Sequence, residues 1–134
     1  MTDDEHYDLA AILATGDVEE LYSGLSVLVS TAADGGRCAA LASFGALDLL
    51  VDPDLPRRAQ AAEATPSLSG AGREKFGRSL GELRDTALAL DNVTIWACSA
   101  SVDTMGLDGE AQLAGVMSTP RFLRATAGAR LIHV

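Results

Sequence analysis

The sequence predicts one α/β domain with a mostly parallel sheet and helices on both faces. Short apolar segments rich in Ala, Val, Ile and Leu alternate with segments in which apolar residues recur every three or four positions. Strands that alternate with helices in this way form parallel sheets covered on both sides. The length of 134 residues suits one domain, so residues 1–134 are assigned to a single unit.

The first strand is predicted from Tyr7 to Ala14, an apolar run followed by polar residues and a glycine. The strongest helix pattern of the chain follows from Asp17 to Asp34, where apolar residues fall at steps of three and four. Asp17 can cap this helix, and Glu20 completes a capping-box pattern. The segment Leu25–Ser30 alternates like a strand when taken alone, but the longer period favours a helix.

A second strand is predicted from Arg37 to Ser43, followed by a turn at Phe44-Gly45 and a short helix over 46–51. The segment from Asp52 to Gly72 contains three prolines and is predicted to be a long irregular excursion, with a helical turn around 57–64. Excursions of this length in compact domains serve as lids, as subunit contacts or as plain surface loops, and the sequence leaves these options open.

The segment Arg73–Leu90 predicts a second amphipathic helix. Gly77 and Gly81 either weaken this helix or allow a neighbouring element to approach it closely. The apolar run Val93–Ala97 is rich in β-branched and aromatic residues and predicts a buried strand that ends at Cys98.

The last part of the chain predicts two more helices and a strand. A short helix is expected from Asp108 to Val116. Thr119 is expected to cap the next helix, with Pro120 at its first position, where proline is well tolerated. Gly128 ends that helix, and Ala129–Val134 predicts the final strand.

Composition and charge exclude several functions. The formal net charge of −9 opposes binding to nucleic acid or to anionic membranes. No apolar stretch reaches the roughly 20 residues that span a bilayer, and the acidic start of the chain does not resemble a signal peptide. The expected location is therefore the cytoplasm, where Cys38 and Cys98 remain free thiols. No spacing of Cys and His resembles a metal site, and no cofactor is expected.

Cys98 is the principal candidate for chemistry. The chain has no phosphate loop, no dinucleotide-binding glycine pattern, no GxSxG elbow, no HExxH and no CxxC pair. A thiol at the end of a parallel strand and the start of a helix lies where amides and the helix dipole favour thiolate. Ser99 or Ser101 can cap that helix. Taken by its position alone, Cys98 is more often a packing residue, the role expected of Cys38 near the start of its strand.

In the four segments Val93–Leu107, Tyr7–Asp17, Phe44–Leu47 and Thr119–Val134, the chain resembles the DsrE/DsrF-like family of small sulfur-relay proteins, and its peroxiredoxin-like sub-branch most of all. The first is Val93–Leu107, with a cysteine at the strand end and Met105-Gly106-Leu107 behind it. Tyr7–Asp17 resembles the first strand and turn of the family. Phe44-Gly45-Ala46-Leu47 resembles its Phe-x-Gly-Leu segment with a shortened spacing, and Thr119–Val134 resembles its closing helix and strand.

The resemblance implies a flavodoxin-like sandwich that assembles into homo-oligomers. It also implies that Cys98 accepts sulfane sulfur as a persulfide and exchanges it with a donor or acceptor protein. Turns at the ends of three strands would then aim backbone amides at one crevice, which would form the substrate site: Thr15, Gly16, Asp17, Ser43, Phe44, Gly45, Ser99 and Ser101. The alternative is a non-catalytic oligomeric α/β protein that binds a small ligand or a protein partner at the same strand ends.

Overall fold

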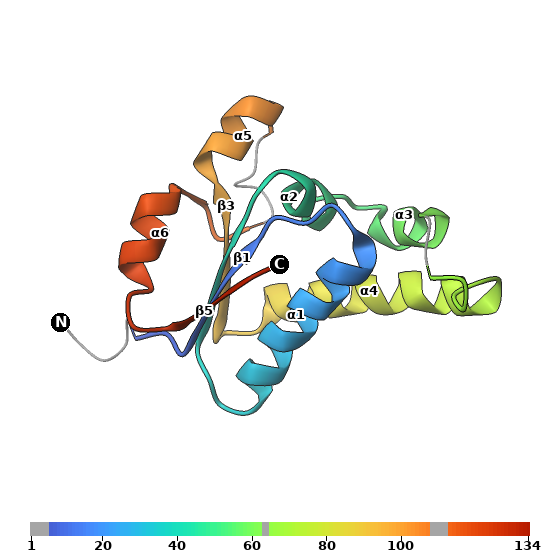
Figure 1. The fold of residues 1–134 in the computed structure, drawn as a ribbon, viewed down its shortest axis with the longest axis horizontal. Coiled ribbons are helices and arrows are strands. Elements are labelled where there is room, and N and C mark those ends of the chain that lie inside the picture. Colours follow the sequence, from blue (N-terminus) through green and yellow to red (C-terminus); the bar gives the residue numbers. More distant parts are fainter. Residues whose placement is uncertain (1–5, 63–64, 108–112) are drawn as a thin grey trace.

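The computed structural model describes residues 6–62, 65–107 and 113–134, and it confirms the predicted α/β fold (Figure 1). Within these residues all five strands belong to one sheet in the order β4-β3-β2-β1-β5, and every neighbouring pair is parallel. The strands are β1 (Leu9–Leu13), β2 (Cys38–Ala42), β3 (Val93–Cys98), β4 (Val116–Met117) and β5 (Arg130–His133). The helices are α1 (Val18–Ala33), α2 (Phe44–Leu50), α3 (Leu55–Ala61), α4 (Ala71–Ala89), α5 (Ser99–Met105) and α6 (Thr119–Ala125).

Helices cover both faces of the sheet, as predicted. Alternate strand residues point to opposite faces, so β1, β2 and β3 each contribute to two apolar cores. The larger core lies against α1, α2, α3 and α4, and the smaller one lies against Phe122 of α6. Figure 1 shows α6 on one side of the sheet, with α1 and α4 on the other.

The helix α1 forms where the periodicity predicts it, and the strand alternative for residues 25–30 is wrong. The Asp17 carboxylate accepts hydrogen bonds from the N–H groups of Glu19 at 2.8 Å and Glu20 at 2.9 Å. Leu21, Leu25 and Leu28 are fully buried against the sheet. The cap and the apolar stripe therefore favour the same structure.

The excursion after α2 is more regular than predicted, because it contains the two-turn helix α3. The expected helical turn around 57–64 is shifted, since α3 begins at Leu55 and ends at Ala61. The helix packs closely on α4 through two glycines. A Cβ atom at Gly77 would lie 2.4 Å from the Pro56 carbonyl oxygen, and one at Gly81 would lie 2.7 Å from Pro56 Cγ. The option that these glycines allow close approach is confirmed.

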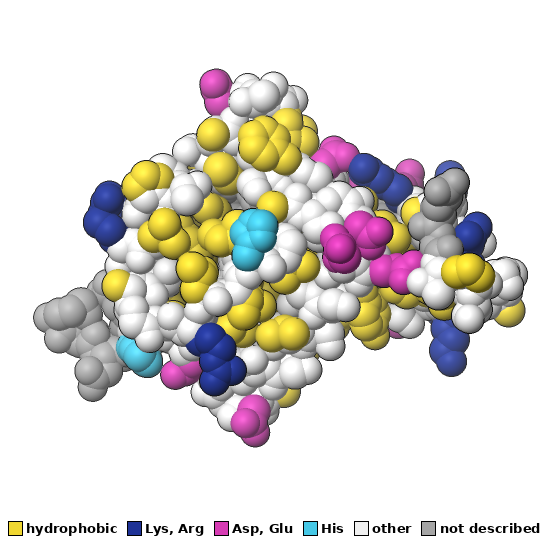
Figure 2. All heavy atoms as spheres, in the orientation of Figure 1, with side chains coloured by type: hydrophobic (Ala, Val, Ile, Leu, Met, Phe, Trp, Pro, Cys, Tyr) yellow, Lys and Arg dark blue, Asp and Glu magenta, His cyan; other side chains and the backbone are white. Residues whose placement is uncertain are grey.

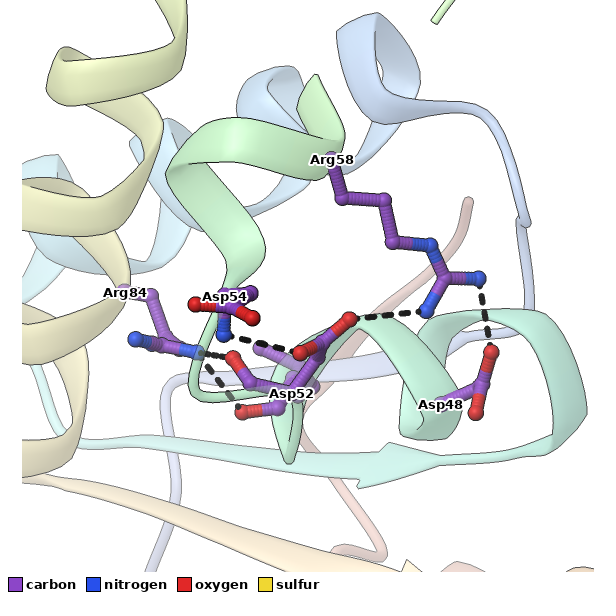
Figure 3. Close-up of polar contacts among 6 residues, drawn as sticks. Asp48, Asp52, Asp54, Arg58 and Arg84 are labelled. Atoms are coloured by element: carbon purple, nitrogen blue, oxygen red, sulfur yellow. Dashed lines mark hydrogen bonds and ion pairs between the residues drawn. The ribbon is translucent and has the colours of Figure 1, made fainter. Parts of the chain in front are cut away.

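Two arginines fix this excursion to the rest of the domain (Figure 3). Arg58 donates to the carboxylates of Asp48 at 2.6 Å and Asp52 at 3.1 Å. Arg84 on α4 donates to the backbone carbonyls of Leu50 at 3.3 Å and Asp52 at 2.6 Å. The N–H of Asp54 and the Arg58 guanidinium together hold the pKa of Asp52 below its ordinary value.

The segment before α6 differs from its prediction. Residues 108–112 of the expected helix over 108–116 lie outside the described residues. Residues 113–116 form a bend and the start of a strand rather than a helix. Ala114 N–H donates to the Ile95 carbonyl at 2.9 Å, and Val116 begins the edge strand β4. Within the described residues, no helix has both the length and the apolar character required to cross a bilayer.

Candidate functional site

The structure brings the ends of β1, β2 and β3 together at one edge of the sheet. Leu13 lies opposite Ala42, and Ala42 lies opposite Ala97, so the three strands end in the same row. The segments that follow these ends are 15–17, 43–45 and 98–101, which contain all the predicted site residues. The predicted crevice residues are therefore neighbours in space, although their individual contacts differ.

Cys98 is the N-cap residue of α5, and its side chain faces the core on the α6 side. Only 6% of its surface is exposed, and its apolar neighbours in this core include Trp96, Met117 and Phe122. The thiol therefore lies at the border between the apolar core and the polar start of α5. Ser99, the first residue of this helix, is half-buried.

Opposing effects act on the pKa of the Cys98 thiol. Burial, the largest effect, raises this pKa. The N–H and hydroxyl of Ser101, the N–H of Ala100 and the hydroxyl of Thr119 act in the other direction, and the resulting pKa is lower than that of an ordinary cysteine. The sulfur makes no regular capping hydrogen bond and lies 4.0 Å from Thr119 Oγ1. The thiolate is thus favoured by several weak contacts rather than by one strong donor.

Ser101 joins the ends of β2 and β3. Its side chain is completely buried, and its Oγ accepts the Phe44 N–H at 3.0 Å. Because that lone pair is engaged, the hydroxyl proton can be directed toward the Cys98 sulfur, where it lowers the thiol pKa. The sequence predicted Ser101 as a cap or site residue, and in the structure it is bonded to Phe44 and is one of the groups that lower the Cys98 pKa.

Thr119 was not among the predicted site residues. It was expected to cap α6, but Ser118 is the N-cap, and Ser118 Oγ accepts the Arg121 N–H at 3.3 Å. Thr119 is therefore the first helical residue, with Pro120 second, and the Thr119 hydroxyl faces Cys98. Ser118 and Thr119 both have a hydroxyl that can cap a helix, so the sequence pattern did not distinguish them.

The turn after β1 contributes less to the site than predicted. Thr15 donates its hydroxyl to Glu20, and Asp17 accepts the first free N–H groups of α1. These amides are occupied by the protein's own carboxylate and are not available to a bound anion. Gly16 touches the turn after β2, since a Cβ at Gly45 would lie 2.7 Å from Gly16 Cα. Gly45 thus permits contact between two backbones of the protein itself.

The turn after β2 contains a strained backbone. Phe44 has a φ of +39°, a conformation that residues with side chains rarely adopt, and the residue is 50% exposed. The predicted turn is in fact the first turn of α2, with Ser43 as its N-cap. Ser43 N–H donates to the Leu13 carbonyl at 2.9 Å, which joins the ends of β1 and β2. Phe44 donates its N–H to Ser101 Oγ, and Ser101 is one of the residues that affect the pKa of the Cys98 thiol.

Cys38 is the packing residue that the sequence predicted. It is completely buried on the opposite face of the sheet from Cys98, and its thiol lies 3.6 Å from the Leu28 carbonyl oxygen. Burial, with a smaller contribution from the charge of Asp8, raises the pKa of this thiol. The two cysteines therefore have pKa values shifted in opposite directions.

No protein-family model matches the chain, and no curated protein matches it. The resemblance to the DsrE/DsrF-like family therefore remains a prediction from the four segments quoted above.

Proposed function

We propose that the protein is a sulfur-relay carrier of the cytoplasm, which holds sulfane sulfur as a persulfide on Cys98. The observation that supports this function best is the environment of Cys98, where N–H and hydroxyl groups lower the pKa of a nearly buried thiol. Thiolate is the form that attacks sulfur, and sulfur exchange needs no general base beside it. The resemblance of the segment Val93–Leu107 to sulfur-relay proteins agrees with this chemistry.

The proposed reaction is a redox-neutral exchange. The Cys98 thiolate attacks the outer sulfur of a donor persulfide, a new S–S bond forms at Cys98, and the donor leaves as thiolate. An acceptor thiolate then attacks the outer sulfur of the Cys98 persulfide and restores the original thiolate. The N–H groups of Ala100 and Ser101 would stabilise the negative charge on the sulfur at both stages. The partners are a donor protein and an acceptor protein, and the carrier itself is a homo-oligomer.

Intact mass spectrometry after treatment with polysulfide or thiosulfate tests this proposal. The wild type should gain one or more sulfur atoms of about 32 Da each, and Cys98→Ser should gain none. Cys38→Ala is the matched control and should gain as much as the wild type. Two oxygen atoms add nearly the same mass as one sulfur atom, so the gain must also disappear on reduction with dithiothreitol, which sulfinic acid resists.

A wild type that takes up no sulfur, or uptake that persists in Cys98→Ser, would contradict the carrier function. The protein would then fit the alternative, a non-catalytic α/β protein that binds a ligand or partner at the strand ends. The half-exposed residue Phe44 is the feature that favours this alternative, because an exposed aromatic side chain offers a contact surface to a partner.

A further inference from the structure

The strand β5 has an open edge. The N–H groups of Arg130 and of Val134, which follows the strand, donate to the carbonyl oxygens of Asp8, just before β1, at 3.1 Å and of Ile12 in β1 at 2.8 Å. Because successive residues of a strand direct their backbone groups to opposite sides, the N–H and C=O groups of Leu131 and His133 point away from β1. Among the described residues no strand pairs with β5 on that side. Four backbone groups are thus available to a further strand.

Apolar side chains flank this edge. Leu131 is 54% exposed, and Figure 2 shows hydrophobic side chains gathered over β5 and the adjoining part of α6. On the other side of the sheet, Gly24 of α1 faces Val134, since a Cβ at Gly24 would lie 3.4 Å from the Val134 methyl groups. Val27, one helical turn after Gly24, is on the same side of α1 and is 43% exposed. The edge is therefore open, and exposed apolar side chains at Leu131 and Val27 lie beside the exposed polar residues Arg130 and His133.

The charge distribution favours this edge as a contact between copies of the chain. None of the 19 acidic residues lies between residues 113 and 134, a segment that holds three of the 10 basic residues. The segment has a formal charge of +3. Because the whole chain has a net charge of −9, the remaining residues have a net charge of −12. Two copies that meet through acidic surfaces would repel each other. The strand β5 itself has no carboxylate side chain, and the positive charge of Arg130 at its start lies near Asp8 and Asp34, which line the same hollow.

We propose that β5 pairs antiparallel with β5 of a second copy, around a twofold axis through Ile132. Leu131 then lies opposite His133 of the second copy, and the four outward backbone groups of each strand pair with those of the other. Arg130 lies opposite Val134 of the second copy, so the two copies of Arg130 are about 13 Å apart along the strands. Such a contact is self-complementary, as a twofold interface requires, and it joins two sheets into one of ten strands.

Helix geometry agrees with this axis. The helix α1 advances about 4.5 Å from Gly24 to Val27. Along β5, the step back from Val134 to Ile132 covers about 6.6 Å in the same direction. Because Gly24 is level with Val134, Val27 is nearly level with Ile132. The twofold axis would therefore place Val27 beside Val27 of the second copy. The exposed apolar residue on α1 would be covered by the same pairing that satisfies β5.

Sedimentation at micromolar concentration tests the proposed dimer. The wild type should have twice the chain mass of 13.9 kDa. Leu131→Lys and Val27→Lys should each raise the dimer dissociation constant by about tenfold or more, because every dimer carries the change twice. Val116→Lys is the matched control, since Val116 is 39% exposed on the opposite edge strand β4, and its dimer should be unchanged. Circular dichroism checks that each variant is folded.

A cysteine scan tests the register. In a Cys98→Ser background, Ile132→Cys should form a disulfide-linked dimer under mild oxidation, because the two Cα atoms would be about 4.5 Å apart. Leu131→Cys is the control, since its two copies would lie diagonally at about 7–8 Å, and it should crosslink much less. A monomeric wild type, an oligomer insensitive to both lysine substitutions, or crosslinking as efficient at 131 as at 132 would overturn the proposal.

Discussion

Ser101→Ala separates the two roles that the structure assigns to this buried hydroxyl. The substitution removes the acceptor of the Phe44 N–H bond of 3.0 Å and one of the groups that lower the Cys98 pKa. A partly buried N–H that loses its acceptor costs about 1–2 kcal/mol of unfolding free energy. The Cys98 pKa should rise, because the hydroxyl no longer stabilises the thiolate. We expect the thiolate population at neutral pH to fall, and the alkylation rate at that pH to fall with it.

The assay is the rate of alkylation of each cysteine by iodoacetamide between pH 6 and 10, followed by mass spectrometry of the peptides. In Ser101→Ala the whole rate profile of Cys98 should move to higher pH, while its plateau at alkaline pH is retained. Ser99→Ala removes a hydroxyl from the neighbouring helical position and is the matched control, because Ser99 is not among the groups that lower the pKa of Cys98. An unchanged profile in Ser101→Ala would refute the role of the Ser101 hydroxyl in lowering the Cys98 pKa.

Three further predictions concern the turns and the buried thiol. Gly45→Ala places a methyl group 2.7 Å from Gly16 Cα, so it should lower the unfolding free energy by about 1–3 kcal/mol in chemical denaturation. Phe44→Gly should change the unfolding free energy by less than about 1 kcal/mol, because relief of the positive φ offsets the lost ring contacts. A loss of about 3–5 kcal/mol, the size expected for Phe122→Ala, would contradict this prediction. The pKa of Cys38 is higher in the folded protein than in the unfolded chain. The stability linked to this difference is fully present below the pKa of the unfolded thiol, and it is lost as the pH rises through the pKa of the folded protein. Denaturation at pH 7 and pH 10 should therefore show a steeper alkaline loss in the wild type than in Cys38→Ala.

The fold could be predicted because each long element has one dominant local signal. In α1 the Asp17 cap and the apolar stripe of Leu21, Leu25 and Leu28 both predict a helix over the same residues. The strand β4 could not be predicted, because two residues, Val116 and Met117, are too few to show a period. Its formation depends on pairing with β3, a tertiary contact that sequence patterns do not contain.

The candidate site was predictable only at the level of strand ends. Because parallel strands end at the same edge, Cys98 could be grouped with the turns at Gly16 and Gly45. The hydrogen bond between Phe44 and Ser101 could not be foreseen, since it depends on a positive φ at an aromatic residue, where sequence rules expect glycine. Thr119 was likewise hidden beside Ser118, because both can cap the same helix.

The pairing of the first strand with the last one has a consequence for synthesis on the ribosome. Leu9 pairs with Arg130, which lies 121 positions later in the chain. While the chain is being made, β1 can be covered on the β2 side early, but its other edge stays unpaired until β5 has left the exit tunnel. The nascent chain therefore exposes an alanine-rich strand edge until the residues up to His133 have been made. Closure of this edge requires a contact of high sequence separation and should be a slow step of folding.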